Sequence, residues 1–136
     1  MSRFDEIAIG DALPERAFTA TNVSLFLYNA VIWNAHRIHY DAPYTTEVEK
    51  HPAIVIDGPL QGDWLSQCVL NWIGEDGELL DFNYSNRRAA HLGETLTVAG
   101  EVVAKDSSAR TVEVTLSVKN SDGATLAPGG AVVRLA

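Results

Sequence analysis

The chain has 136 residues, enough for one domain with a sheet, one or two helices and a hydrophobic core. Its formal net charge of -8 argues against a nucleic-acid partner, because neutralising phosphates takes clustered lysine and arginine side chains. No apolar stretch approaches the roughly 18 residues of a membrane span, the N-terminus lacks a signal-like apolar segment, and the one cysteine excludes an internal disulfide. We therefore expect a soluble, cytoplasmic protein without a membrane partner.

The first long apolar run leads into a group of polar side chains. Residues 23–33 read VSLFLYNAVIW, apolar on almost every side, which predicts a buried helix. Residues 33–41, WNAHRIHYD, follow with two imidazoles, an amide and a carboxylate. We expect the helix to deliver Asn34, His36 and His39 to an interior cleft, where polar groups need partners or a purpose.

Plainer interpretations of these histidines stay open. A single histidine such as His36 beside an apolar helix is more often a core residue with one hydrogen bond than a catalyst. Two histidines at this spacing also resemble metal ligands, but zinc sites usually use more than two nitrogen or sulfur donors. The one thiol, Cys68, lies in a different apolar run. We therefore expect no metal.

A strand and a second helix are predicted next. Residues 53–56 are rich in β-branched side chains, which predicts a short buried strand that leads into the helix. The helix is predicted over 58–74, because Gly58 can cap it, Pro59 suits its first position and Gly74 suits a left-handed end. A broad apolar stripe at helical spacing indicates burial against something large. Its members are Leu60, Trp64, Leu65, Cys68, Val69 and Trp72.

The second half of the chain predicts a sheet. Apolar and polar residues alternate over 80–84, with Leu80, Phe82 and Tyr84 on one side, and again over 111–119, which indicates two half-buried strands. Between them, residues 95–104 predict another long strand, with a bend or bulge at Gly100.

The last elements complete the predicted fold. Asp122 and Gly123 give the strongest hairpin signal in the chain. Residues 131–135 predict a closing strand after a turn at Pro128, Gly129 and Gly130. Strands of this length around one apolar helix predict an α+β domain over residues 1–136, with an antiparallel sheet wrapped around a central helix.

Two segments carry a resemblance to a known family. NAHRIHYDAPYT, followed by a short acidic helix, precedes AIVIDGPLQGDWL. This order resembles the MaoC-like branch of the hotdog superfamily, and within it the hydroxyacyl-thioester dehydratases related to mesaconyl-C4-CoA hydratase. The likeness extends over about residues 15–104. It implies a single hotdog fold and a reversible, (R)-specific hydration or dehydration of an acyl thioester. No cofactor is implied beyond the coenzyme A or acyl carrier protein of the substrate.

The resemblance assigns positions to individual residues. His39 takes the position of the catalytic histidine, and His36 lies on the same motif. Asn34 stands where most (R)-specific enoyl-CoA hydratases have a catalytic aspartate, although the subgroup that this chain resembles often has asparagine there. Asp57 replaces the usual histidine directly before Gly58. It adds a carboxylate near the site.

The implied chemistry needs a base that activates water, an acid that protonates C2, and donors for the enolate-like oxygen. His39 can act as base or acid, because imidazoles exchange protons near neutral pH. The N–H groups at the helix start, around Gly58 and Leu60, suit the thioester oxygen. Asn34 can orient water or substrate through its amide, but it cannot exchange a proton as a carboxylate would.

Charged residues receive weaker assignments. Asp41 could fix the tautomer of His39 or simply cap the following turn. For Arg37 we expect an ion pair with Glu47 or Glu49. The only adjacent basic pair is formed by Arg87 and Arg88, which could meet coenzyme A phosphates or lie at an ordinary solvated strand end.

We expect a dimer or a larger homo-oligomer joined through sheet edges, because a lone hotdog leaves edge strands and part of its helix uncovered. One alternative is a non-catalytic or half-site subunit that pairs with a second MaoC-like chain. Another is a thioesterase with Asp57 or Asp63 as its carboxylate. An acyl-CoA binding module explains the paired histidines least well.

Overall fold

The helices come first in the chain and most of the sheet follows. The computed structural model describes residues 3–136. Its two main helices are α2 (Asn22–Val31) and α3 (Gly58–Ile73), and its long strands are β2 (Gly77–Tyr84), β3 (Thr95–Asp106), β4 (Thr111–Lys119) and β5 (Thr125–Leu135). The short elements are α1 (Arg3–Glu6), β1 (Arg16–Thr19), η1 (Arg37–His39), η2 (Tyr44–Val48) and η3 (Gly74–Asp76).

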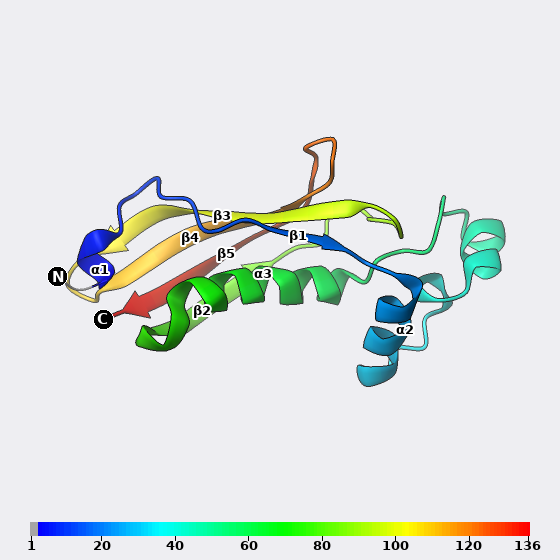
Figure 1. Cartoon of the computed structure of the whole chain (residues 1–136), viewed down its shortest axis with the longest axis horizontal. Coiled ribbons are helices and arrows are strands. Elements are labelled where there is room, and N and C mark those ends of the chain that lie inside the picture. Colours follow the sequence, from blue (N-terminus) through cyan, green and yellow to red (C-terminus); the bar gives the residue numbers. More distant parts are fainter. Residues whose placement is uncertain (1–2) are drawn as a thin grey trace.

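One sheet contains all five strands, in the order β1-β3-β4-β5-β2, and every neighbouring pair is antiparallel. The helix α3 lies along the sheet, and the short α1 and the C-terminus lie at the end of the sheet opposite α2 (Figure 1). This arrangement confirms the predicted α+β hotdog fold, in which an antiparallel sheet wraps around a central helix.

The core lies between α3 and the sheet. The alternation predicted for β4 is confirmed, because its alternate apolar side chains, Val112, Val114, Leu116 and Val118, are buried. Leu65 and Val69 of α3 are fully buried in the same core. The ring of Phe18 on β1 stacks on Trp64 of α3, with ring centroids 4.6 Å apart. The apolar stripe of α3 is thus covered by strands from both halves of the chain.

The predicted bounds of α3 are nearly those observed. Gly74 ends the helix with φ 63°, as expected for a left-handed end, and Pro59 lies in the first turn. The predicted cap was wrong, because Asp57 occupies the N-cap position and Gly58 is already helical. Gly62 faces β2, where a β-carbon would lie 2.3 Å from the ring of Tyr84. A glycine is therefore needed for this close approach of helix and strand.

The segment predicted as a strand over 53–56 forms only one bridge, between Val55 and His91. Backbone hydrogen bonds nevertheless tie it on two sides. The N–H of Val55 donates to the carbonyl of Ile38 at 2.9 Å, the N–H of Ile56 donates to the carbonyl of Ala90 at 2.8 Å, and the N–H of Leu92 donates to the carbonyl of Ile54 at 2.8 Å. We call residues 54–56 the crossing segment. It forms no extended strand, because Val55–His91 is its one bridge and α3 begins at Gly58, two residues after Ile56.

Two predictions based on glycine and proline in the strands were wrong: the turn at residues 128–130 and the bend at Gly100. The turn expected at residues 128–130 does not exist, because β5 continues through it, paired with β4 and β2. Gly100 stays in register opposite Leu116, and the irregularity of β3 falls later, between Val102 and Ala104. Here glycine allows close packing, since a β-carbon on Gly100 would lie 2.9 Å from the Leu116 side chain. The hairpin at residues 122–123 is confirmed between β4 and β5.

A second irregularity changes the face of a predicted side chain in β2. The register with β5 shifts between Leu79 and Asp81, so Leu80 is 40% exposed instead of facing the core. Phe82 and Tyr84 are half-buried, as their alternation predicts. One extra residue moves a side chain to the other face of a strand, because the side-chain period of a strand is two.

The largest correction concerns α2, which was predicted to be buried. It stands at the end of the sheet, beside the start of α3, and not on the sheet face (Figure 1). It buries Leu25 and Asn29 but leaves large apolar side chains exposed: Val23, Phe26, Leu27 and Val31, followed by Ile32 and Trp33. Trp33 is 94% exposed. We call this set the α2 apolar face.

Among residues 3–136, no helix has the length and apolar character that crossing a membrane requires.

Candidate functional site

His39 is buried at the end of η1, and its orientation is fixed. Its Nδ1 lies 2.8 Å from the carbonyl oxygen of Val55 in the crossing segment. A carbonyl oxygen only accepts hydrogen bonds, so Nδ1 carries the proton and donates. Nε2 is then the nitrogen whose lone pair can take a proton from another group. A neutral His39 is therefore held in the tautomer that a general base requires.

Asp57, at the N-cap of α3, lies beside Nε2 of this histidine. It is fully buried, and its Oδ2 is 3.5 Å from Nε2 of His39. Its Oδ1 accepts a hydrogen bond of 2.9 Å from the side-chain amide of Asn29, which also donates to the carbonyl of Leu25 at 2.8 Å. Burial raises the pKa of the Asp57 carboxyl, against the lowering effects of Asn29 and His39.

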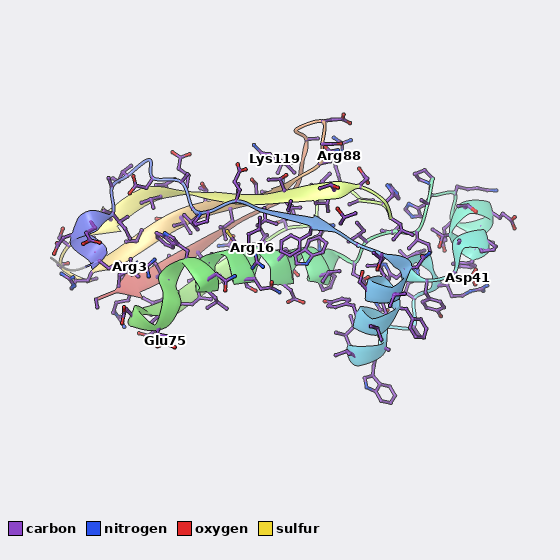
Figure 2. All side chains as sticks on the ribbon, in the orientation of Figure 1. Arg3, Arg16, Asp41, Glu75, Arg88 and Lys119 are labelled. Atoms are coloured by element: carbon purple, nitrogen blue, oxygen red, sulfur yellow. The ribbon has the colours of Figure 1, made fainter. Side chains whose placement is uncertain are left out.

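A cavity of about 360 Å³ opens beside His39. It brings together four residues that the sequence assigned to the site: His39, Gly58, Arg87 and Arg88. The N–H groups of Arg87 and Arg88 both donate to the carbonyl of Leu126, which anchors the pair to β5. Figure 2 places Arg88 and Lys119 at the hairpin end of the sheet. The full lining is Ile38, His39, Val55, Ile56, Gly58, Pro59, Gln61, Asn86, Arg87, Arg88 and Ala89.

The first turn of α3 forms one wall of this cavity. The carboxylate of Asp57 makes no capping hydrogen bond to the helix. The N–H of Gly58 lies in the first turn, where no intrahelical acceptor exists, and its residue lines the cavity. Leu60, the other residue expected to donate there, has its side chain packed against the core. A negative oxygen in the cavity would meet the positive end of the α3 dipole.

Asn34 and His36 do not line this cavity. Asn34 is half-buried and borders a second hollow of about 350 Å³, which α2 and the segment after it line together: Phe26, Asn29, Ala30, Trp33, Asn34, Ala35 and Tyr40. Its Oδ1 accepts a hydrogen bond of 3.0 Å from the N–H of His36. His36 is exposed, with its ring edge-on to that of His39 at a centroid distance of 5.7 Å. The buried polar pair Asn29–Asp57 lies between the two hollows.

Asp41 has its carboxylate engaged away from His39. Its Oδ1 accepts from the N–H of Tyr44 at 3.1 Å, which is the capping alternative, and its Oδ2 pairs with Arg37 at 2.8 Å. The Arg37 hydrogen bonds hold the pKa of Asp41 below its usual range. The partner predicted for Arg37, Glu47 or Glu49, was wrong, because Asp41 is one helical turn away and closer. The carbonyl of Val55 takes the place beside Nδ1 of His39 that Asp41 would fill in the tautomer-fixing alternative, so the capping alternative is the one observed.

Sequence reasoning missed three residues of the site. Asn29 is the single amide within the apolar run VSLFLYNAVIW, and that isolation is the signal that could have identified it. Gln61 lies one turn after Asp57, only 2% exposed, and its Oε1 has no hydrogen-bond partner. Asn86 lines the cavity, and its amide stands 2.3 Å from where a β-carbon on Gly58 would be. Nothing local in the sequence marks Asn86.

Within residues 3–136, no group of three or more histidine, cysteine, aspartate or glutamate side chains is placed to hold a metal ion.

Comparisons with known proteins bear on this site. The chain is 46% identical over 43 residues to a mitochondrial hydroxyacyl-thioester dehydratase type 2 of Schizosaccharomyces pombe, a match over 32% of this chain and 14% of that protein. It is 53% identical over 36 residues to mesaconyl-C(4)-CoA hydratase of Chloroflexus aurantiacus, over 26% of this chain and 13% of that protein. The matches thus span a small part of the length of these curated relatives.

The fold has a solved counterpart. It superposes on a chain of the ChsH1–ChsH2 complex from Mycobacterium tuberculosis with a TM-score of 0.83 and 15% sequence identity, over 95% of this chain and 98% of that chain. At this identity the likeness concerns the fold alone. Residues 7–92, more than half of the chain, match the family described as hydroxyacyl-thioester dehydratase type 2. The resemblance stated from the two sequence segments is therefore confirmed, and the chain belongs to the hydroxyacyl-thioester dehydratase type 2 family.

Proposed function

We propose that this chain catalyses the reversible addition of water to a 2-enoyl thioester, giving a 3-hydroxyacyl thioester. The observation that carries the proposal is the position of His39, which is buried, fixed in one tautomer by Val55, and part of the cavity wall. Family membership supports the same class of reaction. Enoyl thioesters of fatty acid metabolism are the first substrates to test.

In the proposed hydration, the water oxygen forms a bond to C3 while one water proton passes to Nε2 of His39. The electron pair of the double bond moves toward the thioester carbonyl, so negative charge develops on its oxygen. C2 then receives a proton from the imidazolium, which restores neutral His39. Dehydration runs through the same steps in reverse. One imidazole serves as base and then as acid, which general acid–base catalysis permits because a neutral imidazole accepts a proton and an imidazolium donates one.

The negative thioester oxygen needs donors, and the first turn of α3 offers them. We assign this role to the N–H of Gly58, whose residue lines the cavity beside His39. Arg87 and Arg88 line the same cavity and suit the phosphates of a coenzyme A carrier. This local basic pair matters because the net charge of -8 would otherwise repel an anionic substrate.

Asn34 is assigned to positioning. Its carbonyl accepts from the N–H of His36, and its amide favours the ionised form of the Asp57 carboxyl group. Because an amide does not exchange protons, Asn34 orients water or the acyl group while His39 transfers protons. Asn34→Ala should impair turnover, and Asn34→Asp should keep or increase it, since a carboxylate occupies this position in most (R)-specific hydratases.

The test is a spectrophotometric assay of the purified protein with crotonyl-CoA and longer enoyl-CoA substrates, following the enoyl thioester absorbance. His39→Ala should lower turnover by roughly a hundredfold to ten-thousandfold without unfolding the chain. The matched control is His51→Ala, because His51 lies outside the cavity and should leave turnover within a few fold. Full activity of His39→Ala would remove the assignment. Release of free coenzyme A thiol in the same assay would favour the thioesterase alternative.

The proposed assembly is a homodimer in which a second copy covers the α2 apolar face and extends the sheet at an edge strand. The exposed apolar side chains of α2 support it, since a contiguous apolar surface marks an interaction site. The heteromeric alternative is a half-site subunit beside a second MaoC-like chain, and the solved counterpart of the fold comes from a two-chain complex.

Light scattering separates these assemblies. A homodimer should give twice the mass of 14.8 kDa at micromolar concentration, and Phe26→Glu with Val31→Glu should return it to the monomer. A monomeric wild-type chain would contradict the homodimer. In that case, coexpression with a MaoC-like partner tests the half-site alternative. If the heteromer stays fully active with His39→Ala, this chain's own site is idle.

A further inference from the structure

A continuous series of buried polar groups connects α2 with the crossing segment. The amide of Asn29 bonds to Leu25 at one end and to Asp57 at the other. Asp57 faces His39 across 3.5 Å, and His39 bonds to Val55. Asn29, Asp57 and His39 are each at most 7% exposed. Polar groups at this depth are costly to bury, so their mutual arrangement calls for an explanation beyond packing.

Nε2 of His39 and Oδ2 of Asp57 face each other, and they attract each other only if one of the two carries a proton. Nδ1 of His39 already carries its proton toward Val55, so a neutral ring presents a lone pair at Nε2. Oδ2 of Asp57 is buried and has no hydrogen-bond partner. Two acceptors at 3.5 Å repel each other. Protonation at Nε2 turns this repulsion into attraction between an imidazolium and a carboxylate.

We propose that Asp57 is a positioning residue that strengthens proton binding at Nε2 of His39, and that Asn29 holds Asp57 in the orientation this requires. Asp57 thereby places a carboxylate beside Nε2, the ring nitrogen that Val55 leaves free. Its effect on turnover rests on the proposed hydratase function, whereas its effect on the protonation of His39 does not. The deletion of either partner leaves the other buried and uncompensated.

Several other groups act on this pair. The exposed imidazole of His36 lies edge-on to His39, and a positive charge there opposes protonation of His39. Arg87 and Arg88 face His39 across the cavity and act in the same sense. On the side of Asp57, the amide of Asn34 favours the carboxylate. The phenol of Tyr28 is also close enough to interact electrostatically with Asp57. Asp57 is thus the group that favours the imidazolium against its cationic neighbours.

The decisive experiment is an NMR titration of the four histidine imidazoles in the whole chain, with the His39 signal assigned by His39→Gln. Asp57→Asn keeps an oxygen that can accept from Asn29 but removes the negative charge. It should weaken proton binding to His39 at least tenfold, which moves half-protonation down by about one pH unit. Asp81→Asn, which removes an exposed carboxylate of β2, is the matched control and should leave the His39 titration unchanged.

Asn29→Ala is the second variant, because it leaves both titrating groups in place. Without the Asn29 hydrogen bond the ionised form of Asp57 is less favoured, so proton binding to His39 should weaken by a smaller factor, about threefold. It also carries the test if Asp57→Asn does not fold. An unchanged His39 titration in either folded variant would overturn the proposal.

A kinetic readout separates this proposal from the proposed function. If the chain hydrates crotonyl-CoA, Asp57→Asn should move the acidic limb of the kcat profile toward lower pH and lower kcat more than it changes KM. A merely structural role for Asp57 would not shift that limb. If no enoyl-CoA is turned over while the NMR shift is found, the proposed function fails and the role of Asp57 stands. If enoyl-CoA is turned over without the NMR shift, the role of Asp57 fails and the proposed function stands.

Discussion

The helices α2 and α3 have similarly apolar sequences, yet they differ in how much of their apolar surface is buried. The helix α3 buries Trp64, Leu65, Cys68 and Val69 under the chain's own sheet. By contrast, α2 buries Leu25 and Asn29 and leaves most of its large apolar side chains in solvent. The difference lies in position, because α3 runs along the sheet and α2 stands beyond its end (Figure 1). An apolar helix sequence therefore does not by itself determine whether the chain's own sheet covers the helix.

The strongest test of this contrast is a pair of leucine truncations. Leu65→Ala on α3 should lower the free energy of unfolding by about 2–5 kcal/mol, because it leaves a cavity in a closed core. Leu27→Ala on α2, where the side chain is 57% exposed, should change it by less than about 0.5 kcal/mol in the monomer. Urea unfolding at two protein concentrations measures both. A cost for Leu27→Ala that grows with concentration would identify a second copy on α2.

A smaller effect is expected where α3 approaches β2. Gly62→Ala would place a β-carbon against the Tyr84 ring, so we expect a loss of about 1–3 kcal/mol, despite the higher helix propensity of alanine. Asn71→Ala, at an exposed position of the same helix, is the control and should be neutral or slightly stabilising. Thermal unfolding followed by circular dichroism measures both. If Gly62→Ala stabilises the chain, α3 is not fixed against the sheet.

The start of α2 depends on side-chain capping, unlike the start of α3. Thr21 and Ser24 form a reciprocal pair, in which each side chain accepts from the other's N–H. Thr21→Ala should cost about 1 kcal/mol and should reduce helix content at the end of the sheet. The control is Thr46→Ala, because its exposed hydroxyl only donates to the carbonyl of Ala42. If Thr21→Ala and Thr46→Ala lower the free energy of unfolding equally, the Thr21 side chain does not stabilise α2 as a cap.

The smallest expected effect is a pH dependence of opposite sign at two carboxyl groups. Burial raises the pKa of Asp57, so its contribution to stability is complete below the ordinary carboxyl pKa of about 4 and is lost as pH rises through the raised value. The advantage of the wild type over Asp57→Asn should shrink with rising pH. For Asp41, whose pKa is lowered by Arg37, the advantage over Asp41→Asn should shrink as pH falls. Urea unfolding of the wild type and of both variants, repeated at pH values below and above the ordinary carboxyl pKa, measures how each stability difference changes with pH.

What the sequence predicted well was governed by local rules. The bounds of α3, the alternation of β4 and the hairpin at residues 122–123 follow from helix ends, the strand period and turn chemistry. The errors at residues 128–130 and 53–56 have a different cause. Pairing on both sides kept a Pro-Gly-Gly sequence within β5, whereas the apolar run at residues 53–56 forms a single bridge, from Val55 to His91. Tertiary contacts overrode local propensity in both cases.

The site was predictable to a similar extent. His39, Gly58, Arg87 and Arg88 were assigned from motifs and do line one cavity. The proximity of Asp57 to His39 was expected only in general terms, and the bond to Asn29 was missed, because it joins residues 28 positions apart. No periodicity within a single helix encodes such a contact. Asn34 and His36 were expected in the same cleft as His39, yet neither lines it: Asn34 borders the hollow beside α2, and His36 is exposed next to the His39 ring.

The crossing segment gives the site a property that belongs to its dynamics. The same residue, Val55, donates its N–H to Ile38 and accepts from His39, while Ile56 bonds to Ala90 and Ile54 bonds to Leu92. The N–H groups of Val55, Ile56 and Leu92 should exchange their hydrogens with solvent as one cooperative unit. The reason is that the hydrogen bonds of neighbouring residues keep each of them in place. Each local opening would also release the imidazole from its tautomer. The equilibrium between the open and closed forms of the crossing segment therefore sets the fraction of molecules in which His39 can transfer a proton.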